Sequence, residues 1–410
     1  MRTGRYFAGA GLLVLPFILS LQGEQMRAPK ARFLVLLAAL YLAQILWKKV
    51  HPALGCAIAV FSVSSLFMAP TFAWEEFAVF MAAMTSCLWA RGLTEDQIGK
   101  GLEFLELSGL VCAFYGAVLQ YQGLDPLLRA IPGHTLTNPP VFFGQHTLYG
   151  PFAVACFASA LFHGRHIRAA LLATPLILIY SSFTFLALGV VLFLFALRHF
   201  GRYAVFGFVA AALLFFAYSK INPDAEVLND NGRFRVWSLV KRVADRHAIV
   251  GHGANSFRVI FPILQSRELR AANGIKPDEA QTQEARDWFR DADFVRDQWG
   301  VFLHPHSEPL SVYFEFGLIG LILALWWVTA GVFSCFEPWL DAWFEARAFS
   351  EPVRTIYDPG NVHWTLAAIF LSSLANSLGN FNFHLIPQAL LPLWAFAAMT
   401  TRKEGGILEA

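Results

Sequence analysis

Residues 309–334 read PLSVYFEFGLIGLILALWWVTAGVFS, an apolar run in which Glu315 is the single charged residue. A helix needs about 20 such residues to cross the hydrocarbon core of a bilayer, so this run is long enough for a transmembrane helix. It follows the polar sequence HPHSE at 304–308, which places two histidines and a glutamate at its entrance. A carboxyl group inside a span is costly unless it faces a cavity or a partner, which makes Glu315 a candidate functional residue.

The whole chain shares this apolar character. Of its 410 residues, 56% are hydrophobic and only 15% are charged, and the mean hydropathy is +0.50. This composition excludes an ordinary soluble globular protein and indicates a polytopic membrane protein. The net charge of +2 provides no basic excess for a nucleic-acid partner. The five cysteines lie in or beside apolar runs without a zinc-binding spacing, so we expect neither a disulfide framework nor a metal.

Hydropathy predicts an all-α, polytopic integral membrane protein with about 12 transmembrane helices. The candidate spans lie near 6–21, 33–47, 52–72, 76–92, 102–122, 149–163, 167–182, 183–198, 203–218, 309–334, 361–380 and 386–400. The first of them follows a basic N-terminus, as a signal peptide would, but small-residue cleavage chemistry is absent after it, which favours a first span.

Basic residues in the short loops predict the orientation. With the N-terminus in the cytoplasm, the inner loops hold 14 Lys and Arg residues and the short outer loops hold 4. Both termini are then cytoplasmic. The chain divides into an N-terminal bundle at 1–218 of about nine helices, a large outer loop at 219–308 and C-terminal spans at 309–410. Four prolines within 124–150 predict a re-entrant loop at 124–148 in the first unit.

The large outer loop has a basic half and an acidic half. Between 230 and 258 there are six basic and two acidic residues, and between 277 and 300 there are seven acidic and three basic ones. The basic half contains an amphipathic helix after Gly232, with Trp237 on its apolar side, which suits the headgroup layer of membrane lipids. Its Arg233 and Arg235 carry the guanidinium fork that binds phosphate in two-point contacts, and anionic lipid is the alternative ligand.

His306 stands just outside the expected start of the helix near Ser307. An interfacial histidine bonded to backbone and water is the ordinary interpretation, and a zinc site lacks further ligands at suitable spacing. Glu308 and Glu315 lie seven residues apart and so share a helix face, where a structural pair with a basic residue is the alternative to a functional role for Glu315. Gly317 and Gly320 most simply permit close helix packing.

These motifs resemble a known family. His306-Ser307, nine residues and Gly317-x-x-Gly320 match a pattern of the bacterial O-antigen ligases and related O-antigen polymerases. The upstream residues Gly232-Arg233-x-x-x-Trp237 and Gly251-x-Gly253 resemble the start of the same family's periplasmic loop. The segment 144–150, GQHTLYG, resembles its re-entrant region.

The resemblance implies a GT-C-like glycosyltransferase of the bacterial inner membrane with its active face in the periplasm. It would move a glycan from undecaprenyl diphosphate to a lipid A core or a lipid-linked glycan, without metal or cofactor. His306 would be the base that accepts the acceptor proton, and Glu315 would orient it. Where family members carry a Ser-Arg pair before the loop, this chain has Ser181-Ser182. The diphosphate charge would then be met by Arg233 and Arg235, with Arg242, Arg258 and Arg129 as further candidates.

The sequence leaves two other functions open. A polymerase uses the same chemistry on a lipid-linked repeat unit, and nothing in the motifs separates it from a ligase. A solute transporter is a different class that also carries carboxyl groups in spans. Transporters commonly show internal repeats with broken helices in matching halves, and the sequence has no convincing repeat.

Overall fold

The computed structural model describes residues 90, 93–116, 146–178, 182–201, 203–210, 233–253, 256–257, 261, 307–348, 360–378 and 391–399. In this part of the chain the secondary structure is helical and contains no strand, as the all-α prediction requires. The labelled elements are α5 (Glu95–Phe114), α6 (His146–Phe162), α7 (His166–Leu178), α8 (Ser182–Phe200), α10 (Arg233–Ala244), η6 (Asp245–His247), α15 (Glu308–Ala348) and α16 (Asn361–Ser377).

Two of the described helices are long and apolar enough to cross a membrane. They cover Phe183–Phe200 in α8 and Glu308–Leu340 in α15, and α6 and α7 contain shorter apolar segments. The expected spans at 6–21, 33–47 and 52–72 lie outside the described residues, as does the expected span at 76–92 except for residue 90. Residues 124–145 of the expected re-entrant loop also lie outside them. Its last three residues, 146–148, are already helical because α6 begins at His146.

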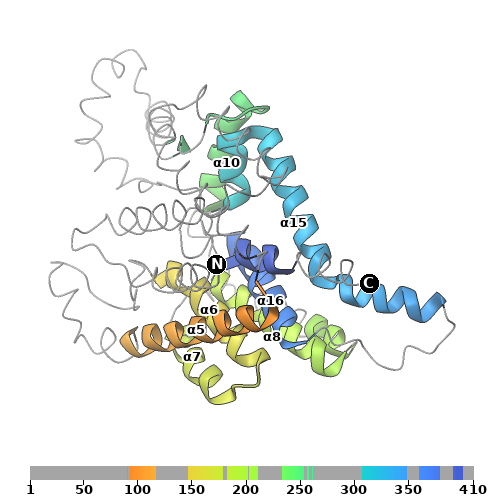
Figure 1. Cartoon of the computed structure of the whole chain (residues 1–410). Helices are drawn as coiled ribbons and strands as arrows, with labels where there is room; N and C mark the ends of the chain where they lie inside the picture. The colour runs from red at the N-terminus through yellow and green to blue at the C-terminus, as the bar shows by residue number, and fades with distance from the viewer. Residues whose placement is uncertain are drawn as a thin grey trace, which may run out of the picture.

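Helices α5, α6, α7, α8 and α16 pack together in one group, and α10 lies at the opposite end of the molecule with the start of α15 (Figure 1). The middle of the group is α6, whose inward positions are occupied by small residues such as Ala153, Ala155 and Ala158, all fully buried. Small side chains let helices approach closely, which is the usual way for helices to associate in a membrane.

Helix α16 is buried around most of its circumference, from Val362 to Ser377. Its Trp364 stacks on Phe162 near the end of α6, with ring centroids 5.9 Å apart, and also contacts Trp339 of α15 at 4.4 Å. Further along α16, Phe370 contacts Trp327 at 5.3 Å. Helix α16 therefore runs antiparallel to α15, and its C-terminal end points toward the half of α15 that begins at Glu308.

Helix α5 begins earlier than hydropathy indicated. The span was expected from 102, whereas the helix begins at Glu95. Thr94 is the reason, because its hydroxyl accepts from the backbone N–H of Gln97 and the Gln97 side chain accepts from the N–H of Thr94. This capping box satisfies backbone donors that the first turn leaves open, so the helix extends through a polar stretch that a hydropathy window excludes.

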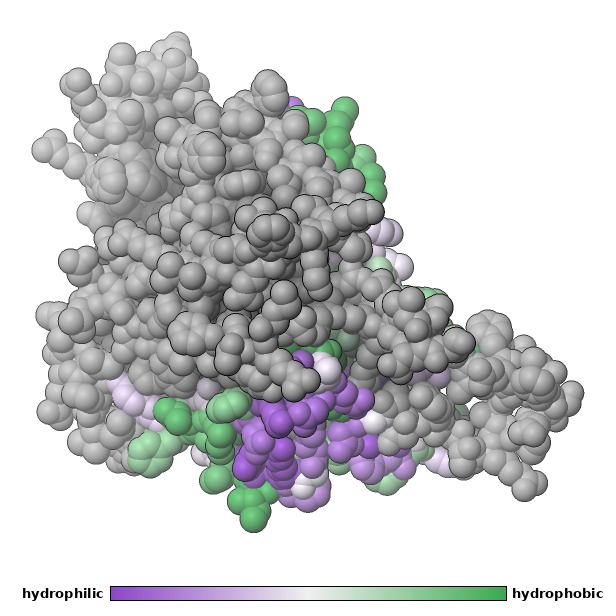
Figure 2. All heavy atoms as spheres, in the orientation of Figure 1, coloured by the Kyte–Doolittle hydropathy of each residue, from purple (hydrophilic) through white to green (hydrophobic). Residues whose placement is uncertain are grey.

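A buried carboxylate fastens α5 to α6 and α7. The side chain of Glu106 is fully buried, and its Oε2 lies 2.8 Å from Arg165 and 3.3 Å from Arg168. Its Oε1 accepts a hydrogen bond of 2.7 Å from the Ser159 hydroxyl. A buried charge is tolerated only with such partners. Figure 2 shows hydrophilic residues gathered in the lower part of the molecule, on the side where α5 and α7 lie in Figure 1.

Helix α15 is longer than expected and is broken once. It was expected over 309–334 and continues to Ala348, passing Pro338. Near its start, Gly317 has φ 63° and ψ −157° and interrupts the helical backbone. A short segment, 308–316, therefore precedes the long apolar part at a different angle.

Candidate functional site

The loop at 248–253 inserts into the break in α15. In an unbroken helix the N–H groups of Leu318 and Ile319 would donate to the carbonyls of the residues four positions earlier. Here Leu318 donates to the carbonyl of Ala248 at 2.7 Å, and Ile319 donates to that of Ile249 at 3.3 Å.

The two carbonyls released by the break are bonded by the same loop. The N–H of His252 donates to the carbonyl of Phe314 at 2.9 Å, and the N–H of Gly253 donates to that of Glu315 at 2.8 Å. Two helical hydrogen bonds are thus replaced by four bonds to the loop. Residues 248–253 and 314–319 are called the glycine junction below.

Two glycines make the glycine junction possible. Gly317 lies in a region of φ/ψ space that is essentially restricted to glycine, and Gly251 has φ 71°. A Cβ on Gly317 would overlap the backbone of Ile249 and Val250, and a Cβ on Gly251 would overlap the backbone of Glu315. Close approach of two backbones is therefore the reason for both glycines.

Gly317 and Gly320 were expected to permit close helix packing. Gly317 contacts the backbone of the loop instead, as described above. A Cβ on Gly320 would overlap the side chain of Phe316 on its own helix. Among the described residues, the small size of Gly320 therefore makes room for Phe316 beside the break in α15.

Helix α10 packs against the first turns of α15 through its apolar side. Val240, Val243 and Ala244 are buried against Phe314 of α15 and Phe257 of the following loop. This is the apolar face that the sequence assigned to the headgroup layer, and in the structure protein covers it. Lys241 and Arg242 of α10 are exposed and so lie away from this buried face.

A hydrogen-bonded carboxylate holds the end of α10 to α15. Asp245 accepts 2.8 Å hydrogen bonds from the Lys241 ammonium and from the Tyr313 hydroxyl. These two bonds, that from Lys241 first, lower the pKa of Asp245 below its ordinary value. No sequence pattern predicted this contact, since Asp245 and Tyr313 are far apart along the chain.

His252 is the buried histidine of the glycine junction. Its ring stacks on Phe314 with centroids 4.4 Å apart, and its Nδ1 lies 3.2 Å from the Phe314 carbonyl. The ring of His247 packs against it at 4.6 Å. Burial lowers the pKa of His252, and the neighbouring His247 and Arg246 lower it further. No local pattern predicted this packing role of His252, because Phe314 lies far from it along the chain.

The first turns of α15 carry a buried polar stripe. Ser307, Glu308, Ser311 and Glu315 are all buried, as expected for two glutamates on one helix face. The helix begins at Glu308, as predicted, and the carbonyl of Ser307 accepts its first bond from Ser311. His306 lies outside the described residues, directly before this stripe in the chain.

The arginines expected at the site are only partly described. Arg233 and Arg235 belong to the first turn of α10, and Arg242 is exposed near its end. Trp237 is half-buried on the same helix. Arg258 and Arg129 lie outside the described residues. The backbone of α10 therefore brings three of the five predicted arginines to the helix that packs on the glycine junction.

The first turns of α6 and α8 meet at Gly150 and Thr184. A Cβ on Gly150 would overlap the side chain of Thr184 near the start of α8. Because α16 is antiparallel to α6, its C-terminal end with Ser373 and Ser377 lies at this end of the helix group too. Ser377 bonds the carbonyl of Ser373 at 2.7 Å, which satisfies its hydroxyl within apolar surroundings.

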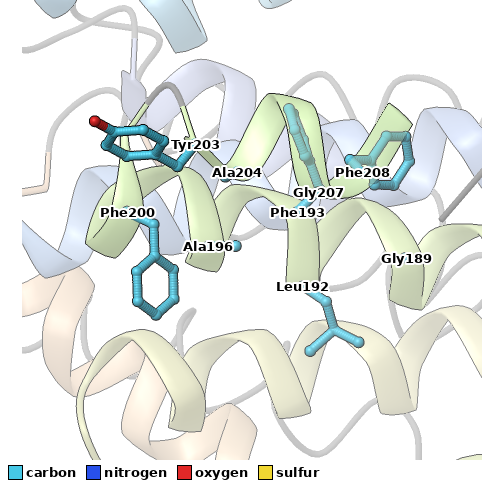
Figure 3. A pocket seen from close by; sticks show the side chains of 9 residues that line it. All are labelled: Gly189, Leu192, Phe193, Ala196, Phe200, Tyr203, Ala204, Gly207 and Phe208. Carbon is cyan, nitrogen blue, oxygen red and sulfur yellow. The ribbon is translucent and has the colours of Figure 1, made fainter. Parts of the chain in front are cut away.

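A separate cavity of about 490 Å³ lies between α8 and the helical residues 203–210. Figure 3 shows Leu192, Phe200 and Phe208 among the side chains that line it. Phe193 and Phe208 pack at 4.8 Å, and the Tyr203 hydroxyl is the one titratable group in the lining. Such a lining suits hydrocarbon and offers no acid–base chemistry.

Within the described ranges, no group of three or more His, Cys, Asp and Glu side chains is placed to hold a metal ion. No protein-family model matches this chain, and comparison with curated proteins gave no match either. The family resemblance therefore rests on the short motifs around Gly251, His306 and Gly317.

Proposed function

We propose that this protein is a membrane glycosyltransferase of the O-antigen ligase type, which transfers a glycan from undecaprenyl diphosphate to an acceptor hydroxyl. The proposal includes about 12 transmembrane helices in the bacterial inner membrane, cytoplasmic termini and a periplasmic active face. The acceptor is a lipid A core or another surface glycan.

One observation carries the proposal. The motifs Gly251-x-Gly253 and Gly317-x-x-Gly320, each of which resembles a motif of that family, contact one another in the glycine junction. Motifs that are distant in sequence but meet in space are expected of one functional site. His306, the histidine of the same resemblance, is next in the chain to Ser307, whose carbonyl accepts the first hydrogen bond of α15.

The proposed chemistry needs a base and cations. The acceptor hydroxyl attacks the anomeric carbon, the bond from that carbon to the diphosphate oxygen breaks, and His306 takes the hydroxyl proton. The diphosphate leaves as an anion, which Arg233 and Arg235 would stabilise. Both belong to the first turn of α10, where the backbone N–H groups also favour anions. Charge stabilisation of this kind is usually the largest catalytic contribution.

The direct test uses purified protein in proteoliposomes with a polyprenyl-diphosphate glycan and an acceptor lipid. His306→Ala should lower the transfer rate by about 10²- to 10⁴-fold, the usual contribution of a positioned base. His304→Ala is the matched control, because it removes the neighbouring histidine and should leave most of the rate. Near-normal transfer by His306→Ala would refute the assignment of the base.

The polymerase remains the second candidate, because it uses the same residues on a lipid-linked acceptor. Deleting the gene and separating the surface polysaccharide by size distinguishes the functions. Loss of all capped polysaccharide indicates a ligase, and collapse to one repeat unit indicates a polymerase. Unchanged polysaccharide would favour a transporter.

A further inference from the structure

We infer that the turn at Ile249 and Val250 is a membrane anchor that inserts into the interfacial layer of the outer leaflet and holds the glycine junction at a fixed height on the bilayer. This inference rests on the proposed topology only for the name of the leaflet. It does not depend on the glycosyltransferase activity.

The turn exposes two large apolar side chains although it belongs to a polar loop. Ile249 is 67% exposed and Val250 is 47% exposed. The helix before them behaves differently, since α10 buries its apolar side against Phe314 and Phe257. The exposed apolar pair is therefore the part of this segment that protein leaves uncovered. An exposed apolar pair in a charged loop indicates a contact surface.

The exposed pair continues the outward face of α15. The backbone of Ile249 and Val250 lies directly against Gly317, and Ile319 donates to the carbonyl of Ile249. Leu318 and Ile319, the next residues of the candidate span, are 49% and 45% exposed. Figure 2 shows a hydrophobic patch at the upper right, where the end of the α10 segment meets α15 in Figure 1.

Two exposed cations precede the apolar pair in the chain. Arg242 and Arg246 are one helical turn apart along the chain and both are exposed. An apolar tip with arginines behind it fits a phospholipid surface, because hydrocarbon takes the apolar side chains and headgroup phosphates take the guanidinium groups. The occupant of this surface is thus the outer leaflet itself, with anionic headgroups preferred.

The anchor gives the structure a way to set the position of the site. The four backbone bonds of the glycine junction tie the turn to the segment 308–316. A turn fixed at the bilayer surface fixes that segment as well, and with it the height at which a lipid-linked substrate would meet the site.

The test places a single cysteine at Ile249, in full-length protein whose five native cysteines are replaced, and labels it with a polarity-sensitive fluorophore in phosphatidylethanolamine–phosphatidylglycerol proteoliposomes. Ile249→Cys should give blue-shifted emission, quenching by lipids brominated near the top of the acyl chain, and loss of quenching by aqueous iodide. Lys241→Cys on the exposed side of α10 is the matched control and should be quenched by iodide.

One further variant distinguishes the possible outcomes. Ile322→Cys reports on the span itself, because Ile322 is 55% exposed on α15. If Ile322→Cys is quenched by lipid but Ile249→Cys is quenched by iodide, the anchor is refuted while the span stands. If both are quenched by iodide, the membrane placement of α15 fails as well. Protection of Ile249→Cys from both quenchers would mean that protein covers the turn, and would also refute the anchor.

A charge on the turn gives an independent check. In folded, monodisperse protein that carries Ile249→Asp, a label at Val250→Cys should become accessible to iodide, because an aspartate is expelled from the interface. Unchanged protection of that label would contradict the insertion of the turn.

Discussion

Gly251 and Gly317 lie against each other's flanking backbone, and neither position has room for a Cβ. Each has a positive φ, and between them run the four hydrogen bonds that join the outer loop to the broken start of α15. A loop and a candidate membrane span are thereby made into one unit. This unit contains the glutamates at the beginning of α15 and lies beside the cations of α10.

The first prediction concerns the backbone of this unit. Gly317→Ala should lower the free energy of unfolding by about 2 kcal/mol or more, because a backbone conformation that is essentially restricted to glycine costs about 1–3 kcal/mol and the Cβ meets the backbone of Ile249. Thermal unfolding in detergent measures this effect. Gly99→Ala is the control, since nothing lies within 4 Å of its added Cβ and alanine favours a helix. Equal melting temperatures for the two variants would contradict the proposed packing.

The second prediction concerns the buried carboxylate. Glu106→Gln should destabilise the protein by about 1–3 kcal/mol, because it removes the buried carboxylate shared by Arg165 and Arg168 and leaves these arginines with the partly exposed Glu103. The arginines are 29% and 34% exposed, so water compensates in part. Lys100→Gln removes a surface pair with Asp96 and should change stability little. A larger loss for Lys100→Gln would overturn this ranking.

The third prediction uses the contact between α6 and α8. Gly150→Ala alone should cost about 1–3 kcal/mol, the usual cost of overpacking, because its Cβ would overlap the Thr184 hydroxyl and methyl groups. Thr184→Ala removes both groups, so the double variant should be more stable than the sum of the single effects predicts. Strictly additive unfolding energies would show that the two side chains do not meet.

The fourth prediction is a pH dependence of the glycine junction. Burial lowers the pKa of His252 in the folded protein, so the unfolded chain binds its proton first as the pH falls. The contribution of His252 to stability is complete above its ordinary pKa of about 6.5 and is lost as the pH falls below it. Hydrogen exchange of residues 247–253, corrected for the intrinsic rate, should therefore become faster at pH 5.5 than at pH 7.5.

The control for the pH dependence is His252→Phe, which retains a ring against Phe314 and cannot titrate. The exchange difference between the two pH values should shrink in this variant. An undiminished difference would show that His252 does not cause the effect.

The fifth prediction concerns the proposed donor site. Arg233→Ala should raise the KM for the polyprenyl-diphosphate donor more than the KM for the acceptor, since a guanidinium at the start of α10 would contact the diphosphate. Lys241→Ala, on the same helix and bonded to Asp245, is the matched control and should leave the donor KM nearly unchanged. A larger effect on acceptor KM would remove Arg233 from the donor site.

The sequence by itself determined the helical character of the chain and the approximate ranges of its described helices, because apolar runs long enough for a span leave the backbone few other ways to satisfy its hydrogen bonds. It also placed the start of α15 near Ser307, one residue before the observed start at Glu308. The helical period placed Glu308 and Glu315 on one helix face, and both are buried. The early start of α5 could have been predicted from the Thr94 capping box, which a hydropathy window does not detect.

Only the tertiary structure decided what the glycines do. Periodicity describes one helix at a time, whereas Gly317 is required by the backbone of Ile249 and Val250, and Gly251 by that of Glu315. In the same way, the apolar face of α10 was expected to contact the membrane, but Phe314 and Phe257 cover it. The exposed apolar residues of this segment are Ile249 and Val250. Contacts between distant segments depend on how the chain packs, and no local pattern records them.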